Sequence, residues 1–169
     1  YTAKVDQVMR PWGFEVVGIH TQANPIEAVR NAQAIFVGGG NTFMLLNRLY
    51  EHQLIEEINK KVLQDGLPYI GSSAGTNVAT RSIHCTNDMP MACPPSFDAL
   101  KLVPFNLNTH YLDPEPDSKH KGETRDERLE EFLQFHERPV LALREGTAIM
   151  VDGDNAILWG ARNAKYFQP

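Results

Sequence analysis

Apolar positions along the chain fall into two patterns, short continuous runs and stripes at helical spacing. Residues 34–40 ("AIFVGGG") and 67–73 ("LPYIGSS") are continuous apolar runs that end in glycine or serine, as buried strands often do. Residues 24–32 and 41–66 carry apolar residues at helical spacing, and Gly66 is placed to end the last helix. This alternation predicts βαβ steps and a parallel sheet with helices on both faces.

The start of the chain predicts a helix followed by a strand. Residues 1–13 place their apolar side chains on one helical stripe, and residues 13–20 ("GFEVVGIH") have the composition of a strand. Parallel α/β domains usually begin with a strand, so we expect a further strand of the central sheet to precede Tyr1. Without it, one edge of the sheet would be open to pairing.

The second half begins irregularly and then returns to regular structure. Residues 81–118 are rich in proline and acidic residues, and only 99–107 ("ALKLVPFNL") resembles a strand. Residues 122–139 predict a helix with a capping box formed by Thr124 and Glu127. Three short β-like runs follow, at residues 140–145, 147–152 and 155–160, and a "GDN" turn joins the last two as an antiparallel pair.

The whole pattern predicts one domain over residues 1–169. Its expected fold is α/β, with a three-layer, doubly wound and mostly parallel sheet of the flavodoxin-like kind and antiparallel C-terminal strands. A length of 169 residues with 42% hydrophobic residues is enough for one sizeable core.

Charge and cysteine content narrow the functional classes. The formal net charge of -5, without a basic run, argues against binding to nucleic acid or to an anionic membrane. The two cysteines, Cys85 and Cys93, do not make a secreted disulfide framework, so a reducing cytoplasm is expected. No apolar run reaches the roughly 18 residues that would span a bilayer. The sequence therefore predicts a soluble protein and leaves small polar substrates open.

One motif at a strand-to-helix junction indicates nucleophilic chemistry. Gly71, Ser73 and Gly75 form G-x-S-x-G, in "GSSAG", which is the nucleophile elbow of α/β hydrolases. The elbow holds the central side chain exposed at strained backbone angles, and the glycines avoid collisions of Cβ atoms with neighbouring strands. A serine hydroxyl also needs a base and a group that orients the base. By itself the motif fits equally a tight turn that needs small residues.

A second glycine cluster, "VGGGNTF" at residues 37–43, lies at another strand-to-helix junction. Free backbone N–H groups there favour an anion. The run lacks the spacing of nucleotide-binding loops, so an oxyanion hole formed by the N–H groups of Gly40 and Ala74 is the better hypothesis. The simpler alternative is a turn in which Asn41 or Thr42 caps the next helix.

Among the histidines, His110 is the candidate base. It follows the strand-like run at 99–107 and opens an irregular loop, and strand ends at one edge of a parallel sheet are where such folds assemble their sites. Asp88, in "TNDMP", lies between Ser73 and His110 and gives the order Ser, Asp, His of elbow hydrolases. Asp88 could equally cap a turn before Pro90.

Several motifs in fixed order resemble one family. "GGGNTF", "GSSAGTN", "TNDMP", "FDAL", "NTHY" and "HKGETR" look like peptidase E, the α-aspartyl dipeptidase family, from about Tyr1 to near Trp159. The resemblance implies a serine peptidase that cleaves dipeptides with an N-terminal aspartate. It also implies a sheet like that of the class I glutamine amidotransferases and chemistry that needs no metal or organic cofactor.

Carried over residue by residue, the resemblance makes Ser73 the nucleophile, His110 the base and Asp88 the carboxylate partner of His110. Glu145, in "LREG", also follows a strand and is the alternative third member. Of the two carboxylates, Asp88 is the preferred partner.

The same resemblance assigns the remaining site positions. Gly40 and Ala74 fall on the oxyanion-hole positions, and Arg125 matches an arginine that would bind the substrate's aspartate side chain through a bidentate guanidinium contact. Asn41 joins Arg125 as a substrate-binding candidate. A solvent-facing arginine in the first turn of a helix is the simpler alternative for Arg125.

Two other functions stay open. The chain could be a catalytically silent relative that binds small acidic ligands in the same cleft, or a hydrolase of other acidic peptides on the same fold. The expected partner in each case is a small acidic molecule. A homo-oligomer, or pairing of the open sheet edge with the preceding strand, is also possible from the sequence.

Overall fold

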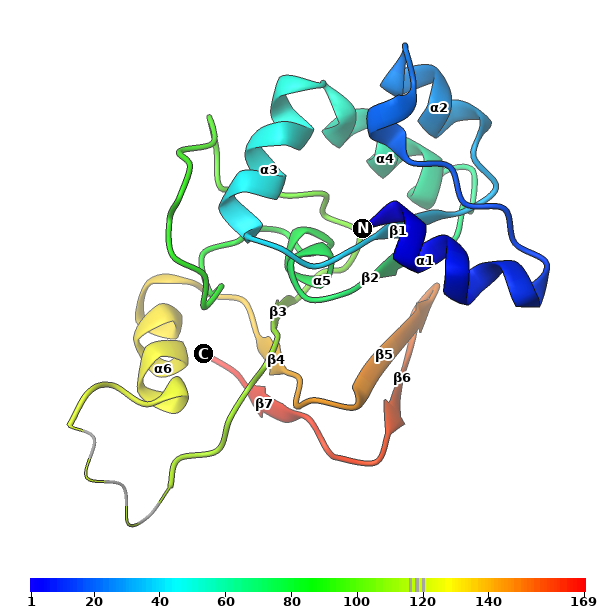
Figure 1. Ribbon diagram of the computed structural model, residues 1–169. Coiled ribbons are helices and arrows are strands. Elements are labelled where there is room, and N and C mark those ends of the chain that lie inside the picture. The colour runs from blue at the N-terminus through cyan, green and yellow to red at the C-terminus, as the bar shows by residue number, and fades with distance from the viewer. Residues whose placement is uncertain (116, 118, 120) are drawn as a thin grey trace.

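Helices and strands are interleaved along the chain in the computed structural model, which describes residues 1–115, 117, 119 and 121–169. Two short 3-10 helices, Arg10–Trp12 and Ile19–Thr21, lie between the first two α-helices. The interleaving, visible in Figure 1, confirms a mixed α/β fold. The elements are α1 (Thr2–Met9), α2 (Pro25–Asn31), β1 (Ile35–Val37), α3 (Thr42–Glu51), α4 (Leu54–Leu63), β2 (Tyr69–Gly71), α5 (Ala74–Val78), β3 (Asn106–Asn108), α6 (Arg125–Phe135), β4 (Val140–Ala142), β5 (Thr147–Asp152), β6 (Asn155–Gly160) and β7 (Lys165–Phe167).

The strands pair in parallel near the site and antiparallel toward the C-terminus. β1 pairs with β2 in parallel, and β3 pairs in parallel with β4. β7 adds to the other edge of β4 in the antiparallel sense. β5 and β6 form a hairpin in which Asp152 faces Asn155 across a two-residue loop, so the "GDN" turn is confirmed. Within the described ranges these pairings make three small sheets.

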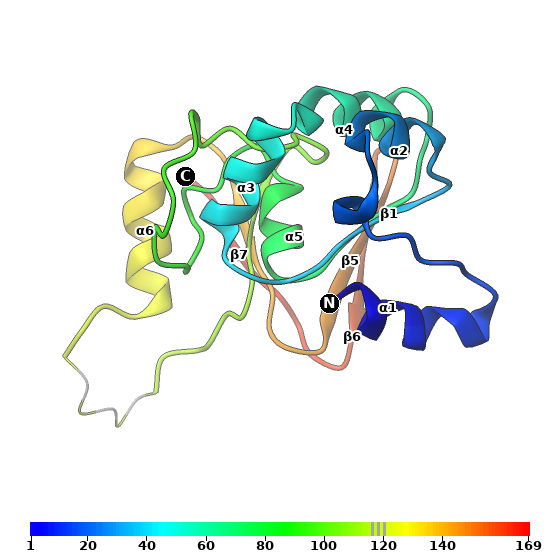
Figure 2. The same cartoon turned by 45° about the horizontal axis from the view of Figure 1, so that its top comes forward.

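One hydrophobic cluster joins α2, α3, α4 and α5. Leu46 on α3 and Val78 on α5 are completely buried, and Ile58 on α4 is nearly so. Each such side chain stabilises the fold by about 1.5–3 kcal/mol. Figure 2 shows α2, α3 and α4 gathered on one side of the strands. This cluster holds the helices that follow β1 and β2, which are the two junctions with glycine motifs.

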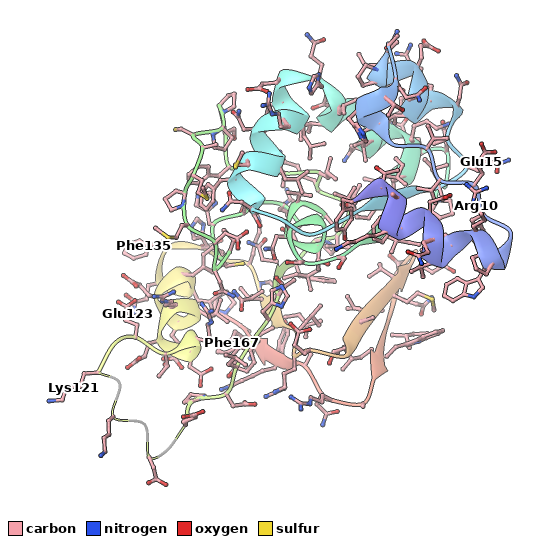
Figure 3. The ribbon with its side chains drawn as sticks, viewed as in Figure 1. Arg10, Glu15, Lys121, Glu123, Phe135 and Phe167 are labelled. Carbon is pink, nitrogen blue, oxygen red and sulfur yellow. The ribbon has the colours of Figure 1, made fainter. Side chains whose placement is uncertain are left out.

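A second cluster packs α6 against β4 and β7. Leu129 of α6 meets Val140 of β4 and Phe167 of β7, together with Tyr111 from the loop after β3. Phe135, at the end of α6, is instead exposed to solvent (Figure 3). The second cluster therefore supports β4 and β7, and with β4 the strand end that precedes Glu145.

Two predicted strands differ from the structure. Residues 13–20 form an irregular segment that ends in the 3-10 helix Ile19–Thr21, with Phe14 and Val17 both 61% exposed. A strand needs a neighbour for its backbone hydrogen bonds, and among the described residues β1 pairs with β2 alone. In the predicted strand 99–107 only Asn106 and Leu107 belong to a strand, β3, and the residues before them form a loop. The sequence also gave no sign of β7.

No helix of the described ranges is both long and apolar enough to cross a bilayer.

The two cysteines should differ sharply in reactivity. Both are free thiols; Cys93 is exposed, whereas Cys85 lies in the second cluster, where burial raises its pKa to about 11. Because the thiolate is the reactive form, iodoacetamide at neutral pH should label Cys93 in the native protein and Cys85 only after unfolding. Mass spectrometry of the labelled protein, with a Cys93→Ser variant as the control, measures this. Equal labelling rates of the two thiols under native conditions would contradict the packing described here.

Candidate active site

Ser73 lies at a sharp turn between β2 and α5. Its backbone has φ 53° and ψ -112°, a region that residues with side chains rarely adopt. Ser73 is partly exposed, while Ala74 and Gly75 immediately after it are buried in α5. The strained turn therefore aims the serine side chain away from the packed helix, as a nucleophile elbow does.

The two glycines of the motif are required by close packing. A Cβ atom on Gly75 would lie 1.9 Å from the carbonyl oxygen of Val37 on β1, and one on Gly71 would lie 2.7 Å from the carbonyl oxygen of Gly75. Real Cβ atoms do not approach backbone so closely. For Gly75 the neighbouring strand is the obstacle, as the sequence predicted, whereas for Gly71 it is the elbow itself.

The structure brings Ser73, His110 and Glu145 together. Ser73 Oγ lies 2.7 Å from Nε2 of His110, and Nδ1 of the same ring makes a hydrogen bond with Oε1 of Glu145. An ionised carboxylate can only accept hydrogen bonds, so the proton of neutral His110 lies on Nδ1. Nε2 is then left to accept from the Ser73 hydroxyl. This geometry lets His110 act as a general base toward the hydroxyl.

Parallel pairing of β3 and β4 positions the histidine and the glutamate. The ladder continues beyond the strands, since Leu143 N donates to Asn108 O at 2.8 Å and Tyr111 N donates to Leu143 O at 3.0 Å. His110 and Glu145 therefore leave neighbouring strands at the same edge. His110 has φ 57°, which sharply changes the chain direction directly after the strand.

Among the described residues Asp88 makes no side-chain hydrogen bond with His110, so the geometry favours Glu145 over Asp88, the residue preferred from the sequence, as the third member. Its carboxylate Oδ2 accepts a hydrogen bond from Thr42 N at 2.7 Å, at the first turn of α3. Among the described residues, the side-chain hydrogen bonds of His110 go to Ser73 and Glu145. The order of residues along the chain does not determine which strand ends are adjacent, and here the segment with Asp88 crosses the start of α3 instead.

The glycine loop after β1 lies against the serine. A Cβ atom on Gly39 would be 3.3 Å from Cβ of Ser73, and Gly75 N donates to Gly38 O at 3.1 Å. Within the part of the chain that is described, the N–H groups of Gly40 and Ala74 donate no hydrogen bond to protein atoms. These two N–H groups are therefore available to a bound group, and their assignment as an oxyanion hole remains a prediction.

The two candidate substrate-binding residues lie in different surroundings. Asn41 caps α3, where Oδ1 accepts from Met44 N and Nδ2 donates to Met89 O at 2.8 Å. Its simpler alternative as a helix cap is thus observed. Arg125 is the first residue of α6, after the predicted capping box of Thr124 and Glu127, which is present.

The Arg125 guanidinium is partly buried. Burial and the neighbouring positive charge of Arg128 lower its pKa from the ordinary value. Among the described residues it belongs to none of the ion pairs. A partly desolvated cation of this kind is available to a carboxylate, although Arg125 does not line the cleft at Ser73.

A small open cleft of about 160 Å³ adjoins the serine and the histidine. Its walls include Ser72 and Thr76 from the elbow and Thr147 from β5. The cleft is open to solvent, since the side chains of His110 and Glu145 are 55% and 69% exposed. The space suits a small polar molecule.

The sequence did not predict an ion pair beside this cleft, between Arg144 and Asp113. Arg144 donates to both carboxylate oxygens of Asp113, at 2.6 and 2.8 Å, and lies 5.1 Å from the centre of the Tyr111 ring. The bond with Arg144 lowers the pKa of the Asp113 carboxyl. The pair ties the loop after His110 to the strand that leads to Glu145. No spacing rule connects residues 31 positions apart, so the sequence held no signal for it.

Within residues 1–115, 117, 119 and 121–169, no group of three or more histidine, cysteine, aspartate or glutamate side chains could hold a metal ion. His120, the first residue of the "HKGETR" motif, lies outside the described residues.

Enzymes of the serine hydrolase class place a serine at such an elbow against a histidine and a carboxylate on an α/β scaffold, and the fold and site define that class here. The particular family follows from sequence. The family model described as Peptidase family S51 matches residues 1–159, and the chain belongs to that family of peptidases. The resemblance found in the motifs is thereby confirmed.

Curated relatives and a solved structure agree with this assignment. A Drosophila melanogaster protein named "Probable alpha-aspartyl dipeptidase" is 67% identical over 99% of this chain and 70% of that protein. A Streptomyces coelicolor protein named "Peptidase E" is 52% identical over 99% of this chain and 69% of that protein. A crystal structure of a peptidase E-like protein from Listeria monocytogenes superposes with a TM-score of 0.72 at 24% identity, covering 96% of this chain and 78% of the other, which supports the fold.

Proposed function

We propose that the protein is a serine dipeptidase that hydrolyses dipeptides with an N-terminal aspartate through an acyl-enzyme on Ser73. The observation that carries the proposal is the 2.7 Å contact of Ser73 Oγ with His110 Nε2, with Glu145 on the opposite ring nitrogen. The substrate class follows the names of the relatives, an α-aspartyl dipeptidase at 67% identity and a Peptidase E at 52% identity.

In the proposed reaction, Ser73 Oγ attacks the scissile carbonyl carbon while His110 Nε2 takes the hydroxyl proton. The carbonyl oxygen becomes an oxyanion on the N–H groups of Gly40 and Ala74. Collapse of this intermediate breaks the peptide C–N bond, and His110 gives its proton to the leaving amine. Water then repeats both proton transfers and releases aspartate.

Glu145 is the carboxylate that orients His110 in this proposal. It accepts from Nδ1–H and stabilises the imidazolium that forms when His110 holds the serine proton. Asp88 instead holds the first turn of α3 through Thr42 N. Asn41 likewise supports the glycine loop, because both ends of its carboxamide bind protein groups.

Arg125 is proposed to bind the aspartate side chain of the substrate. Its lowered pKa reflects partial burial of a cation that lacks an ion-pair partner among the described residues, and a substrate carboxylate would supply that partner. A bidentate contact would discriminate aspartate from neutral residues at this position.

The exposure of His110 and Glu145 favours a second candidate function. Electrostatic interactions are strongest where water is excluded. More than half of the His110 side chain and more than half of the Glu145 side chain are exposed to solvent. A catalytically silent relative that binds small acidic ligands in the same cleft would tolerate such exposure. A hydrolase of other acidic peptides on this fold is a further alternative. The peptides that it cleaves would distinguish it from an aspartyl dipeptidase.

The finer architecture is also part of the proposal. We infer one domain over residues 1–169 with a three-layer, doubly wound arrangement, supported by the parallel pairs β1–β2 and β3–β4. Within the described residues β1 has β2 as its one neighbour, and Phe36 and Ile70 are exposed. We propose that this edge pairs with a further polypeptide segment or a second copy. Free Cys85 and Cys93 suit the reducing cytoplasm proposed as its location.

Replacing Ser73 with alanine should abolish hydrolysis of Asp-Leu while the fold persists. Loss of the nucleophile in serine peptidases costs on the order of 10⁶-fold in kcat. Release of leucine, followed for Asp-Leu, Glu-Leu and β-aspartyl-leucine, gives both the activity and the substrate class, and circular dichroism checks folding. Full activity of the folded variant would refute the assignment, and a preference for Glu-Leu would favour the other acidic-peptide hydrolase.

Labelling separates the enzyme from the silent binder without reference to any peptide. A fluorophosphonate should attach to Ser73 in a one-to-one ratio, because that reaction requires an activated hydroxyl, and mass spectrometry locates the adduct. Folded wild-type protein that binds aspartate yet takes up no label would support the silent alternative.

Glu145→Gln and Asp88→Asn decide which carboxylate serves His110. Replacing the orienting carboxylate of a triad by an amide lowers kcat by roughly 10⁴-fold, which we expect for Glu145→Gln. Asp88→Asn keeps an oxygen that can accept from Thr42 N, so kcat should change by less than about tenfold. Steady-state kinetics on Asp-Leu measure both variants. The reverse ranking would restore Asp88 as the partner of His110.

Arg125→Gln should weaken discrimination for aspartate. Loss of one charged contact to substrate should lower kcat/KM for Asp-Leu by roughly 10- to 100-fold, and much less for Asn-Leu. Arg128→Gln is the matched control, because Arg128 lies in the same helix and pairs with Glu123 at 3.4 Å. Equal losses on Asp-Leu and Asn-Leu would argue against a contact with the aspartate carboxylate.

A further inference from the structure

A buried carboxamide lies directly beneath the candidate site. Asn77 is 4% exposed and lies on α5 one helical turn after Ser73, to whose carbonyl oxygen its backbone N–H donates at 3.0 Å. Its side-chain Nδ2 donates to Thr42 Oγ1 at 3.0 Å and to Thr86 Oγ1 at 3.1 Å. Its Oδ1 accepts from Thr109 Oγ1, in the longest of these bonds at 3.5 Å.

The partners of Asn77 adjoin each part of the proposed machinery. Thr42 comes two residues after Gly40 and is completely buried at the start of α3. Thr109 directly precedes His110 and is 8% exposed. One side chain therefore connects the glycine loop and the strand end that carries the base, and it is itself fixed to the turn that carries the nucleophile.

The segment Thr86–Asp88 adds further hydrogen bonds to this network. Thr86 Oγ1 donates to Thr42 Oγ1 at 3.3 Å and accepts from Asp88 N at 3.3 Å. Asn87 Nδ2 donates to the carbonyl oxygen of Thr109 at 2.9 Å. The same short segment thus holds both the start of α3 and the end of β3, and Asn77 occupies the space between them.

A carboxamide suits this position because it offers two donors and an acceptor in one rigid plane. An apolar side chain of similar size would fill the space but would remove the acceptor of the buried Thr109 hydroxyl and one donor from each of Thr42 Oγ1 and Thr86 Oγ1. Satisfied buried polar networks favour one arrangement of the elements that they join.

We propose that Asn77 is a positioning residue that sets the placement of Ser73, the Gly38–Asn41 loop and His110 relative to one another. It acts through its neighbours and does not touch substrate. The proposal rests on the proposed function, since it concerns the same three groups. Misplacement of catalytic groups by about 1 Å can cost about 100-fold in rate, so loss of the network should appear mainly in kcat.

The test compares Asn77→Leu with Asn106→Leu. Asn106 is another buried asparagine, 0% exposed, on β3, and its Nδ2 bonds go to Ser82 and Cys85, away from the site. Both variants should lower Tm. Asn77→Leu should also lower kcat for Asp-Leu and the rate of fluorophosphonate labelling by roughly 100-fold with KM changed only a few-fold, whereas Asn106→Leu should keep both rates within about threefold.

The proposal would be overturned if folded Asn77→Leu kept the wild-type kcat and labelling rate. It would also be overturned if Asn106→Leu lowered both rates as much as Asn77→Leu does. If Asn77→Leu does not fold, Thr42→Val removes one hydroxyl of the network at nearly constant shape, and its kcat should fall by roughly tenfold. An unchanged kcat in Thr42→Val would then overturn the proposal.

Failure of the proposed function would look different. Wild-type protein that neither labels nor cleaves Asp-Leu would refute the serine dipeptidase. The role of Asn77 would then be decided by crystal structures of wild type and variant: an Oγ to Nε2 distance between Ser73 and His110 that stays at 2.7 Å in the variant would overturn it, and a lengthened distance would support it.

Discussion

The close approach of α5 to β1 is the constraint on which the site depends. Gly75 lies so near the carbonyl oxygen of Val37 that a methyl group could not be inserted, and Ser73 reaches this packing only at a positive φ. The strain of that turn is balanced by burial of α5, where Ala74 and Val78 are completely enclosed. The exposed hydroxyl and the free N–H groups beside it are thus consequences of how a helix packs on a strand. The geometry of the Ser73 turn is built into the core of the fold.

Local patterns in the sequence were enough for most of the fold. The strands β1 and β2, predicted within 34–40 and 67–73, the capped helix and the C-terminal hairpin each depend on residues close together in sequence, through apolar runs, a capping box and a two-residue turn. Residues 13–20 have strand composition but form no strand, because a strand is stable only beside another and the described residues supply none. β7 is three residues long, too short for periodicity to show.

Part of the candidate site could likewise be predicted from local sequence, and part could not. The elbow and a histidine at a strand end could be predicted, since both follow from where strands stop. The choice between Asp88 and Glu145 could not, because it depends on β3 lying beside β4, a fact of topology and not of order. Asn77 and Arg144 were invisible for a related reason: each has a partner more than 30 residues away in sequence, Thr42 for Asn77 and Asp113 for Arg144. Motifs reveal groups that must be exposed at a particular turn, whereas groups that support them are found through contacts alone.

The register of β3 against β4 has a consequence for folding. Asn108 faces Ala142, and this pairing decides that the histidine and the glutamate just beyond the strands meet. A slip by one residue would displace them by about 3.3 Å and turn one side chain to the opposite face of the sheet. A one-residue slip would therefore separate the two side chains. Enzymatic turnover is therefore a reporter of correct strand alignment, and during refolding it should return with that alignment and later than the helices.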